Sequence, residues 1–294
     1  MNDPLVTIGV PFYNNQDTLL DSIKSIFAQT FQDWELILLD DGSSDDSLKI
    51  ARSIDDRRVR VFSDGQNRKL PTRLNQIIEL SRGKYIARMD ADDICWASRI
   101  EKQLDVFQSD PDVDVLGTGI VYLDALDQPL GLHLYPSSHA EICKEPNRTF
   151  RMCHPSIIAK KSWYEKNRYD ESLPVAQDFD LWLRTYKHSK FANVPEPLLY
   201  YRLDQSFNLK KQFAARYTSA KFLFEHHKNA GKRGKALLNW MIQYGKFAVT
   251  VLMFATGLRK SLRDRRFEPL SYEELSHYKR EIERIKKTEL PLHS

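Results

Sequence analysis

The run RMDADD at residues 88–93 holds the residues best placed for chemistry. Asp90 and Asp92 flank Ala91 and directly follow the apolar run Tyr85–Met89, so both carboxylates leave a strand end in similar directions once the chain turns. Hard divalent cations prefer carboxylate oxygens, and Mg²⁺ commonly combines one or two carboxylates with substrate phosphates. The run therefore predicts a cation site. The alternative is an acidic loop that only caps the helix after it.

A second acidic run, LLDDGSSD, occupies residues 38–45. It is typical of a strand-to-helix turn in which Gly42 adopts positive φ and Ser44 or Asp45 caps the next helix. In addition, Asp41 could accept hydrogen bonds from a nucleotide base or ribose at the edge of a sheet. Both interpretations apply to the same turn.

The elements that position these aspartates alternate along the first half of the chain. Apolar residues at helical spacing separate four short apolar strand runs, at Leu5–Val10, Trp34–Leu39, Val59–Phe62 and Tyr85–Met89. This alternation predicts an α/β fold with a mostly parallel sheet and helices on both faces. Because ligands gather at the carboxyl ends of parallel strands, both acidic runs should meet at one edge.

Later segments are less regular. Asp178–Tyr186 is a helix candidate, and Phe191–Tyr201 is extended but is expected to be edge-like or irregular because of Pro195 and Pro197. The Ser271–Lys287 stretch interleaves Glu with Arg and Lys and predicts a solvated helix.

Four runs in this order resemble glycosyltransferase family 2, whose members are inverting enzymes with the GT-A fold. They are VTIGVPFYNNQDTLLDSIKSIFAQTFQDWELILLDDGSSDDS, KLPTRLNQIIELSRGKYIARMDADD, HPSIIAKKSW and QDFDLWLR, within roughly residues 4–204. The resemblance implies a GT-A-like domain over 1–204, in which the second half builds the acceptor site, and a basic helical extension over 205–294.

The resemblance also implies roles for single residues. Tyr13 is expected to stack on the base, Asp41 to contact it, and the DXD pair Asp90 and Asp92 to hold a manganese or magnesium ion. Expected nucleotide-sugar contacts are Pro11, Tyr13, Asn14, Asp41, Arg73, Asn75, Asp90, Ala91 and Asp92.

On the acceptor side, Asp178 matches the general base of the family. It would take the proton of the acceptor hydroxyl during in-line attack at the anomeric carbon. Further acceptor or diphosphate contacts are expected from His154, Gln177, Trp182 and Asp204. Gln177 replaces the usual glutamate and so removes a charge beside the base, and Asp204 stands where relatives often carry histidine.

Charge is divided unevenly along the chain. Residues 1–204 carry a net charge of −7 and residues 205–294 a net charge of +11, within a total of +4. Inside the basic part, residues 237–258 contain a single charged residue, Lys246, between basic flanks. A polar stripe along this segment favours a helix lying in an anionic membrane interface. A helix packed on protein and a spanning helix are the alternatives.

The resemblance, taken together with the basic tail, implies a metal-dependent hexosyltransferase-type enzyme. It would move a sugar, expected from a UDP donor, to a glycan acceptor linked to polyprenyl diphosphate, as in surface polysaccharide or O-antigen biosynthesis. No secretion signal is apparent, so we expect a cytoplasmic protein that is peripheral on the inner face of the cell membrane. Because the basic tail brings no stacking platform or recognised motif, a nucleic-acid partner is not expected.

Two other functions remain open at this point. A nucleotidyltransferase would use the same sheet and cation, but VPFYNNQDT lacks a glycine-rich basic loop. A non-catalytic, membrane-associated binding module would not need Asp178 together with Asp41, Asp90 and Asp92.

Overall fold

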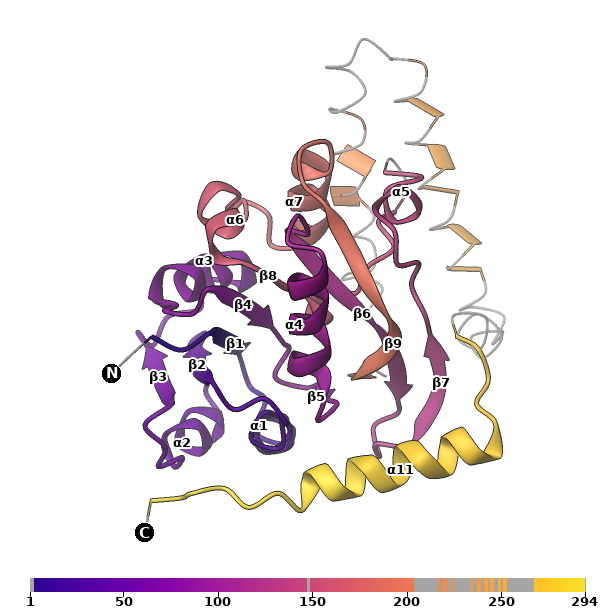
Figure 1. The fold of residues 1–294 in the computed structure, drawn as a ribbon. Coiled ribbons are helices and arrows are strands. Elements are labelled where there is room, and N and C mark those ends of the chain that lie inside the picture. Colours follow the sequence, from indigo (N-terminus) through magenta and orange to yellow (C-terminus); the bar gives the residue numbers. More distant parts are fainter. Residues whose placement is uncertain are drawn as a thin grey trace.

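The computed structural model describes residues 3–146, 149–203 and 267–293, and single residues or short runs between 217 and 252. The described chain forms one nine-stranded sheet with helices packed against it (Figure 1). The sheet order is β3(Val59–Ser63), β2(Trp34–Asp40), β1(Val6–Phe12), β4(Tyr85–Arg88), β8(Ile158–Lys160), β6(Val115–Leu123), β9(Phe191–Arg202) and β5(Ile94–Cys95), with β7(Pro129–His133) paired to β6.

The predicted α/β class is confirmed, with one refinement of the sheet. Strands β3, β2, β1 and β4 are parallel, as expected from the alternation of strands and helices. Beyond β4 the sheet is mixed, because β8 runs antiparallel to both β4 and β6 and β9 returns parallel to β6. Both acidic runs therefore follow parallel strands, whereas the second half of the chain adds strands that are partly antiparallel.

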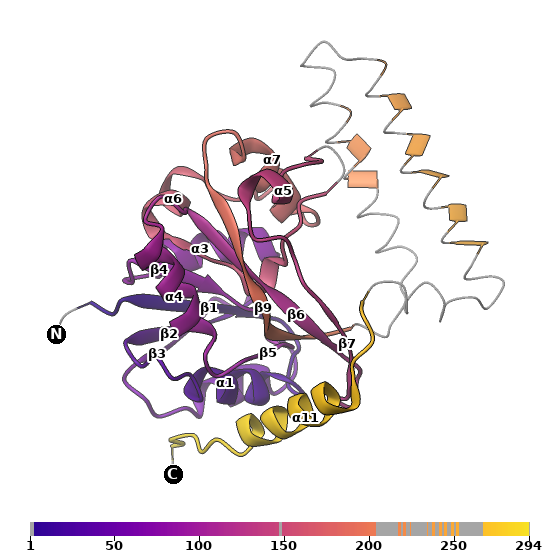
Figure 2. The ribbon, with the colours of Figure 1, turned by 45° about the vertical axis from the view of Figure 1, so that its right-hand side comes forward.

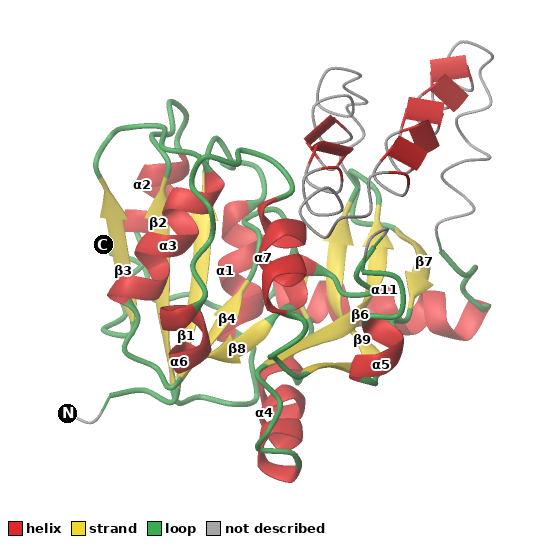
Figure 3. Cartoon of the chain, turned by 90° about the horizontal axis from the view of Figure 1, so that it is seen from above, coloured by secondary structure: helices red, strands yellow, loops and turns green. Residues whose placement is uncertain are grey.

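Helices cover both faces of the parallel half (Figure 3). Leu36 and Leu38 of β2 belong to one core cluster, and Ile37 and Leu39 belong to the other, which explains the unbroken apolar run of this strand. The first cluster includes residues of α1(Leu19–Phe27), α2(Ser47–Arg52) and α4(Arg99–Ser109). The second includes residues of α3(Leu70–Leu80), α5(His139–Ile142), α6(Lys161–Lys166) and α7(Gln177–Thr185).

Close packing of α3 on β1 depends on Gly9. A Cβ atom at this position would lie 2.4 Å from Cγ2 of Ile77. Any side chain here would push α3 away from the sheet, and with it the residues that this helix supplies to the site.

Strand β9 accommodates its prolines by a local irregularity. The pairing with β6 passes from Thr118↔Val194 to Gly119↔Pro197, so two residues of β9 are skipped. After this shift Leu199 and Tyr200 pair with β6 on one side and β5 on the other. The strand is therefore irregular as predicted, but its second half lies inside the sheet.

The helix expected to be solvated is instead docked. Helix α11(Tyr272–Lys286) begins with a capping box formed by Ser271 and Glu274. Its residues Tyr278, Ile282 and Ile285 are buried in a third cluster with residues of β5, β6, β7 and β9. Figures 1 and 2 show α11, in yellow, running below β7 and beside α1. The solvated-helix prediction was wrong because these three apolar positions share one face among many charges.

The chain leaves and returns to the sheet at neighbouring residues of β6. The Leu203 N–H donates to the Leu123 carbonyl over 3.0 Å, and the Phe267 ring lies 5.4 Å from the Tyr122 ring. From Phe267 the chain continues into α11 and ends beside α2, where the His293 N–H donates to the Ser53 carbonyl. Residues 267–293 thus pack on the same sheet as residues 3–203.

The predicted membrane segment 237–258 is only partly covered by the described residues. Those described between 217 and 252 are helical. None of the helices in the described part of the chain is long and apolar enough to cross a membrane. The division of the chain at residue 204 stays a prediction.

Candidate active site

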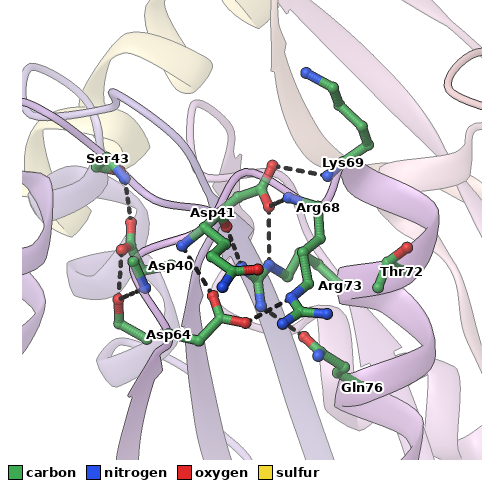
Figure 4. A network of polar contacts seen from close by, with 12 residues as sticks. Asp40, Asp41, Ser43, Asp64, Arg68, Lys69, Thr72, Arg73 and Gln76 are labelled. Atoms are coloured by element: carbon green, nitrogen blue, oxygen red, sulfur yellow. Dashed lines mark hydrogen bonds and ion pairs between the residues drawn. The ribbon is translucent and has the colours of Figure 1, made fainter.

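Asp41, directly after β2, is the centre of a polar network (Figure 4). Its Oδ1 accepts from the Arg68 backbone N–H at 2.7 Å and from Arg73 Nε at 2.8 Å, and its Oδ2 accepts from the Lys69 N–H at 3.2 Å. Asp41 is 7% exposed and Arg73 is 1% exposed, so this ion pair is almost fully desolvated. The network fixes the loop after β3 against the end of β2.

Gly42 permits that close approach. It has φ of +77°, and a Cβ atom there would lie 2.8 Å from the backbone carbon of Gln66. A side chain at residue 42 would therefore be strained and would collide with the loop that Asp41 holds.

Two residues predicted to contact the donor are engaged with protein groups. The Arg73 guanidinium also donates to Asp64 at 2.6 Å and to Gln76 at 2.7 Å. The Asn75 amide donates to the Tyr169 carbonyl at 3.0 Å and accepts from the Tyr169 N–H at 3.0 Å. Arg73 thus orients Asp41, and Asn75 anchors the segment before α7. Their direct contact with a donor stays a prediction.

The end of β1 supplies the other predicted base contacts. Pro11 fits inside the sheet because β4 pairs with β1 only as far as Gly9↔Arg88, so the missing N–H of the proline faces no strand partner on that side. Asn14 has φ of +54°, and its side-chain oxygen accepts from the Ser44 N–H at 2.8 Å. Tyr13, next to it, is 48% exposed. The hydrogen bond between Asn14 and Ser44 therefore joins the loops after β1 and β2, and the exposed ring of Tyr13 lies beside the turn that follows Asp41.

Asp90, Asp92 and Asp93 form an acidic cluster after β4. Ligand oxygens of the three carboxylates lie within 4.8 Å of one another. Burial and the charge of Asp90 raise the pKa of Asp92 to about 6. Burial, with the charges of Asp92 and Asp90, raises the pKa of Asp93 well above its usual value. Each additional negative charge is thus costly in this cluster without a compensating cation.

The donor set fits a divalent cation. All three groups offer carboxylate oxygens, which suit Mg²⁺ or Mn²⁺ better than softer metals. Asp93 Oδ2 is buried and has no hydrogen-bond partner among the described residues. An unpartnered buried acceptor within a cluster of carboxylates is a position at which a bound cation supplies the missing partner.

Arg88, the last residue of β4, lies beside this cluster. It is 4% exposed, and its Nη2 donates to Asp90 Oδ1. Nε and Nη1 are buried without a partner among the described residues. A cavity of about 10 Å³ is lined by Arg88, Tyr164, Tyr169 and apolar residues of β1, α3 and β4. That volume is about what one water molecule needs.

Asp178, the predicted base, lies in the first turn of α7. Burial raises the pKa of its carboxyl, and the charges of Arg88 and Asp90 act on that pKa in opposite directions. The same electrostatic neighbourhood therefore contains the residue predicted as base and the acidic cluster, although 85 or more positions separate them in the sequence.

Three further predicted contacts, His154, Trp182 and Gln177, lie on the α7 side of the sheet. His154 Nε2 hydrogen-bonds Tyr169 Oη over 2.8 Å, and its ring packs against Trp182 with centroids 5.9 Å apart. Burial, helped by the charge of Arg88, lowers the pKa of His154 well below its usual value, so this imidazole is neutral. Gln177 begins α7 and is buried. Asp204 lies outside the described residues.

Sequence reasoning missed four residues of this site: Arg88, Asp93, Tyr169 and Arg202. Arg88 and Asp93 stand in the run RMDADD itself, so proximity to Asp90 was the available signal. Arg202 stands two residues before Asp204, in a run that the sequence did single out, but its hydrogen bond to Asp93 joins residues 109 positions apart. Tyr169 has no such local signal, because a long-range contact with Asn75 holds it.

Comparison with known proteins identifies the family. Residues 7–167 match the profile described as glycosyl transferase family 2. The chain belongs to glycosyltransferase family 2. Over 264 residues it is 29% identical to the putative glycosyltransferase EpsE of Bacillus subtilis, covering 87% of this chain and 92% of that protein. Over 267 residues it is 30% identical to the uncharacterized glycosyltransferase MJ1057 of Methanocaldococcus jannaschii, with coverages of 87% and 91%.

Solved structures confirm the fold of this family 2 glycosyltransferase. TarS 1–349 of S. aureus, crystallised with UDP-GlcNAc, matches with a TM-score of 0.62 and 15% identity, over 97% of this chain and 80% of that one. The same TarS fragment without a named ligand gives a TM-score of 0.61 at 16% identity, over 85% and 73%. The predicted GT-A-type fold is therefore confirmed.

Proposed function

We propose that this glycosyltransferase transfers a sugar, with inversion, from a UDP-sugar to a hydroxyl group of a glycan acceptor in a cation-dependent reaction. The observation that carries the proposal is the position of Asp178. It lies in the first turn of α7, and this helix is near the end of β4. The Trp182 ring of α7 lies 5.9 Å from the His154 ring, and three residues after His154 the Ile157 carbonyl accepts from the Arg88 N–H over 2.8 Å. The charges of Arg88 and Asp90 also act on the pKa of Asp178. A base and a cation site must share one cleft for a single displacement to occur.

The donor half of the proposal rests on the β1 and β2 loops. Tyr13 presents an exposed ring for stacking, and Asp41 is held rigidly by Arg73 and two backbone N–H groups. TarS, which has the same fold, was crystallised with UDP and with UDP-GlcNAc. We therefore assign the nucleoside to this end of the site, with Tyr13, Asn14 and Asp41 as its contacts.

Asp90 and Asp92 are the proposed cation ligands, and Asp93 supports them. A divalent ion held there would neutralise the diphosphate leaving group. Asp178 removes the proton of the acceptor hydroxyl as that oxygen attacks the anomeric carbon and the bond from the sugar to the diphosphate breaks. Because burial raises the pKa of Asp178, its carboxylate is a stronger base than an exposed aspartate.

Replacement of the base tests the proposal. We expect Asp178→Asn to lower the transfer rate by about 10²–10⁴-fold, since it removes proton transfer, and to leave UDP affinity nearly unchanged. The measurement is UDP release from a panel of UDP-sugars with Mn²⁺ and a polyprenyl-diphosphate-linked sugar, together with calorimetric titration of UDP.

The matched control is Asp180→Asn in the same helix, where the carboxylate pairs with Arg184 at 2.8 Å. It should keep transfer activity. Full activity of Asp178→Asn, or inactivity of the wild-type protein with every donor tested, would contradict the proposal.

We propose further that the acceptor is lipid-linked and that the enzyme is peripheral on the inner face of the cytoplasmic membrane. The support is a set of exposed apolar side chains in the described helical residues, within a basic part of the chain: Tyr217, Leu237, Leu238, Met241, Ile242, Val249 and Leu252. Apolar side chains with basic neighbours suit the interface of an anionic bilayer.

Vesicle binding tests the membrane part. The protein should sediment with vesicles that contain phosphatidylglycerol and stay in solution with pure phosphatidylcholine vesicles, and high salt should weaken the binding. Equal binding to both vesicle types, or none to either, would argue against an anionic surface as partner.

A further inference from the structure

Arg202, at the end of β9, donates hydrogen bonds to the turn that carries the acidic cluster. Its backbone N–H donates to Asp93 Oδ1 over 3.0 Å. Its guanidinium Nη1 donates to the backbone carbonyl of Asp92 over 2.7 Å. One residue from a distant strand therefore holds both the main chain of one cluster residue and the side chain of the next.

The rest of the Arg202 guanidinium is held by two carboxylates. Its Nη2 donates to Asp127 Oδ2 over 3.0 Å and approaches Asp21 Oδ2 at 3.4 Å, and its Nε donates to Asp127 Oδ1. Asp21 belongs to α1, and Asp127 lies in the turn between β6 and β7. These two carboxylates fix the direction in which the guanidinium points.

Lys286 of α11 completes the arrangement. Its Nζ lies 3.0 Å from Asp21 Oδ2 and also donates to Asp127 Oδ2. Its own carbonyl accepts from Lys24 Nζ over 2.8 Å, which ties the last turn of α11 to α1. Two cationic and two anionic side chains thus form one compact network that joins the C-terminal helix to the acidic turn.

We propose that Arg202 and Lys286 are positioning residues that hold the Asp92–Asp93 turn in its cation-binding shape, so that docking of α11 is part of building the active site. This inference rests on the proposed cation-dependent function. It extends that function to two residues that touch neither cation nor donor: Arg202 at the end of β9, and Lys286, which lies more than 80 residues further along the chain.

Electrostatics explains why the turn needs such support. Three carboxylates within 4.8 Å of one another repel, and the repulsion is strong where water is excluded. Hydrogen bonds from Arg202 oppose the separation of Asp92 and Asp93. Burial alone would raise the pKa of Asp127, but hydrogen bonds from Arg202 and Lys286 hold it below its usual value, so Asp127 stays ionised.

The expected loss of Mn²⁺ affinity depends on how far the replaced residue lies from the cation ligands. Residues that orient metal ligands typically change metal affinity by about 10–100-fold when they are replaced. Lys286 acts one contact further out than Arg202, so we expect Lys286→Met to weaken the affinity for Mn²⁺ about 3–10-fold. Methionine keeps the length and apolar stem of the side chain and removes only the charge.

The experiment compares Lys286→Met with Lys286→Arg and with Lys287→Met. Lys287 is the exposed neighbour at the end of the same helix, so its replacement removes an equal charge outside the network. Mn²⁺ affinity is measured by calorimetric titration in the presence of UDP, and thermal melting reports folding separately. We expect weaker Mn²⁺ binding in Lys286→Met, recovery in Lys286→Arg and wild-type affinity in Lys287→Met.

A double-mutant cycle with Asp127→Asn tests whether the two residues act together. If Lys286 acts through Asp127, the double variant should lose less Mn²⁺ affinity than the two single losses combined. Additive losses would contradict the proposed path from α11 to Arg202.

Other results would also overturn the inference. They are Lys286→Met with a lower melting temperature but wild-type Mn²⁺ affinity, and equal losses in Lys286→Met and Lys287→Met. Failure of the proposed function looks different, because the wild-type protein itself would then bind neither UDP nor Mn²⁺.

Discussion

At the scale of single residues, the site is built from aspartates whose surroundings assign them different tasks. Asp41 accepts three hydrogen bonds and pairs with buried Arg73. Asp92 and Asp93 lie in a cluster where burial and neighbouring charge raise their pKa values. The pKa of Asp178 is raised chiefly by burial. The same residue type thus occupies three different environments, which fit the proposed roles of rigid acceptor, cation ligand and base.

The Asp41–Arg73 pair gives a first prediction. Asp41→Asn leaves the buried guanidinium of Arg73 without its charge partner, so we expect a loss of about 3 kcal/mol in the free energy of unfolding and weaker UDP binding. Urea denaturation and calorimetric titration of UDP measure the two effects. Asp46→Asn is the control, because Asp46 is exposed and makes no side-chain capping bond at α2. Equal behaviour of the two variants would refute the structural role of Asp41.

The acidic cluster gives a second prediction, on pH. Because the pKa of Asp92 is about 6, protons compete with the cation below that pH. The affinity for Mn²⁺ should rise about tenfold per pH unit up to about pH 6 and then level off. Calorimetric titration between pH 5 and 7.5 measures this rise, and a flat profile would contradict the raised pKa.

In the metal-free protein, pH acts on folding stability in the opposite direction to its effect on Mn²⁺ affinity. The folded state raises the pKa of Asp92 from 3.8 to about 6, so it binds the proton more tightly than the unfolded chain does. The stabilisation is present at low pH and is lost as pH rises through about 4 to 6. With EDTA present, Asp92→Asn should remove this part of the pH dependence of the melting temperature.

At the scale of elements, the parallel half of the sheet was predictable from the sequence, but the pairing of β8 and β9 was not. The strands at Trp34–Asp40 and Tyr85–Arg88 are short apolar runs that end at turn residues, and both acidic runs follow them as expected. The antiparallel β8 and the inner half of β9 depend on which distant strand each one pairs with, and local periodicity does not contain that information.

Site residues were predicted where the signal was local in the sequence and were missed where it depended on distant contacts. Asp90 and Asp92 were predicted from their spacing. By contrast, the hydrogen bonds of the Arg73 guanidinium to Asp41 and Asp64 had no signal in the sequence, and its contact with a donor stays a prediction. Arg202 acts on the acidic turn through a contact between residues 110 positions apart. Such pairings arise from the packing of whole elements and become visible only in three dimensions.

Helix α11 gives the prediction at this scale. Ile285 is 1% exposed in the third core cluster, and Ile285→Ala should lower the free energy of unfolding by about 2–4 kcal/mol through a lost contact and a cavity. Tyr272→Ala, at a position 84% exposed in the same helix, should change it by less than about 0.5 kcal/mol. Chemical denaturation measures both. Similar small effects would indicate that α11 contributes little to the core.

At the scale of the whole molecule, the described ends of the chain pack on one domain. Residues 267–293 cover Ile94, Val121 and Tyr200 of the sheet and continue to α2. The basic segment between residues 203 and 267 therefore lies inside the sequence of the folded unit, because the chain after it returns to the sheet.

A further prediction separates membrane binding from catalysis. Because Leu203 and Phe267 contact adjacent residues of β6, a short glycine–serine linker in place of residues 205–266 should leave the sheet and α11 intact. The shortened protein should bind UDP and Mn²⁺ like the full chain and lose binding to phosphatidylglycerol vesicles. Vesicle sedimentation and calorimetric titration test it, and retained vesicle binding would place the membrane contact elsewhere.

The chain leaves and rejoins the sheet beside adjacent residues of β6, and this has an evolutionary consequence for the segment that joins Leu203 to Phe267. A cassette inserted between them can lengthen, shrink or change its charge without shifting the register of any strand. On the proposed membrane role of this segment, the surface that the enzyme binds can then diverge among descendants while the sheet and its acidic turns stay the same.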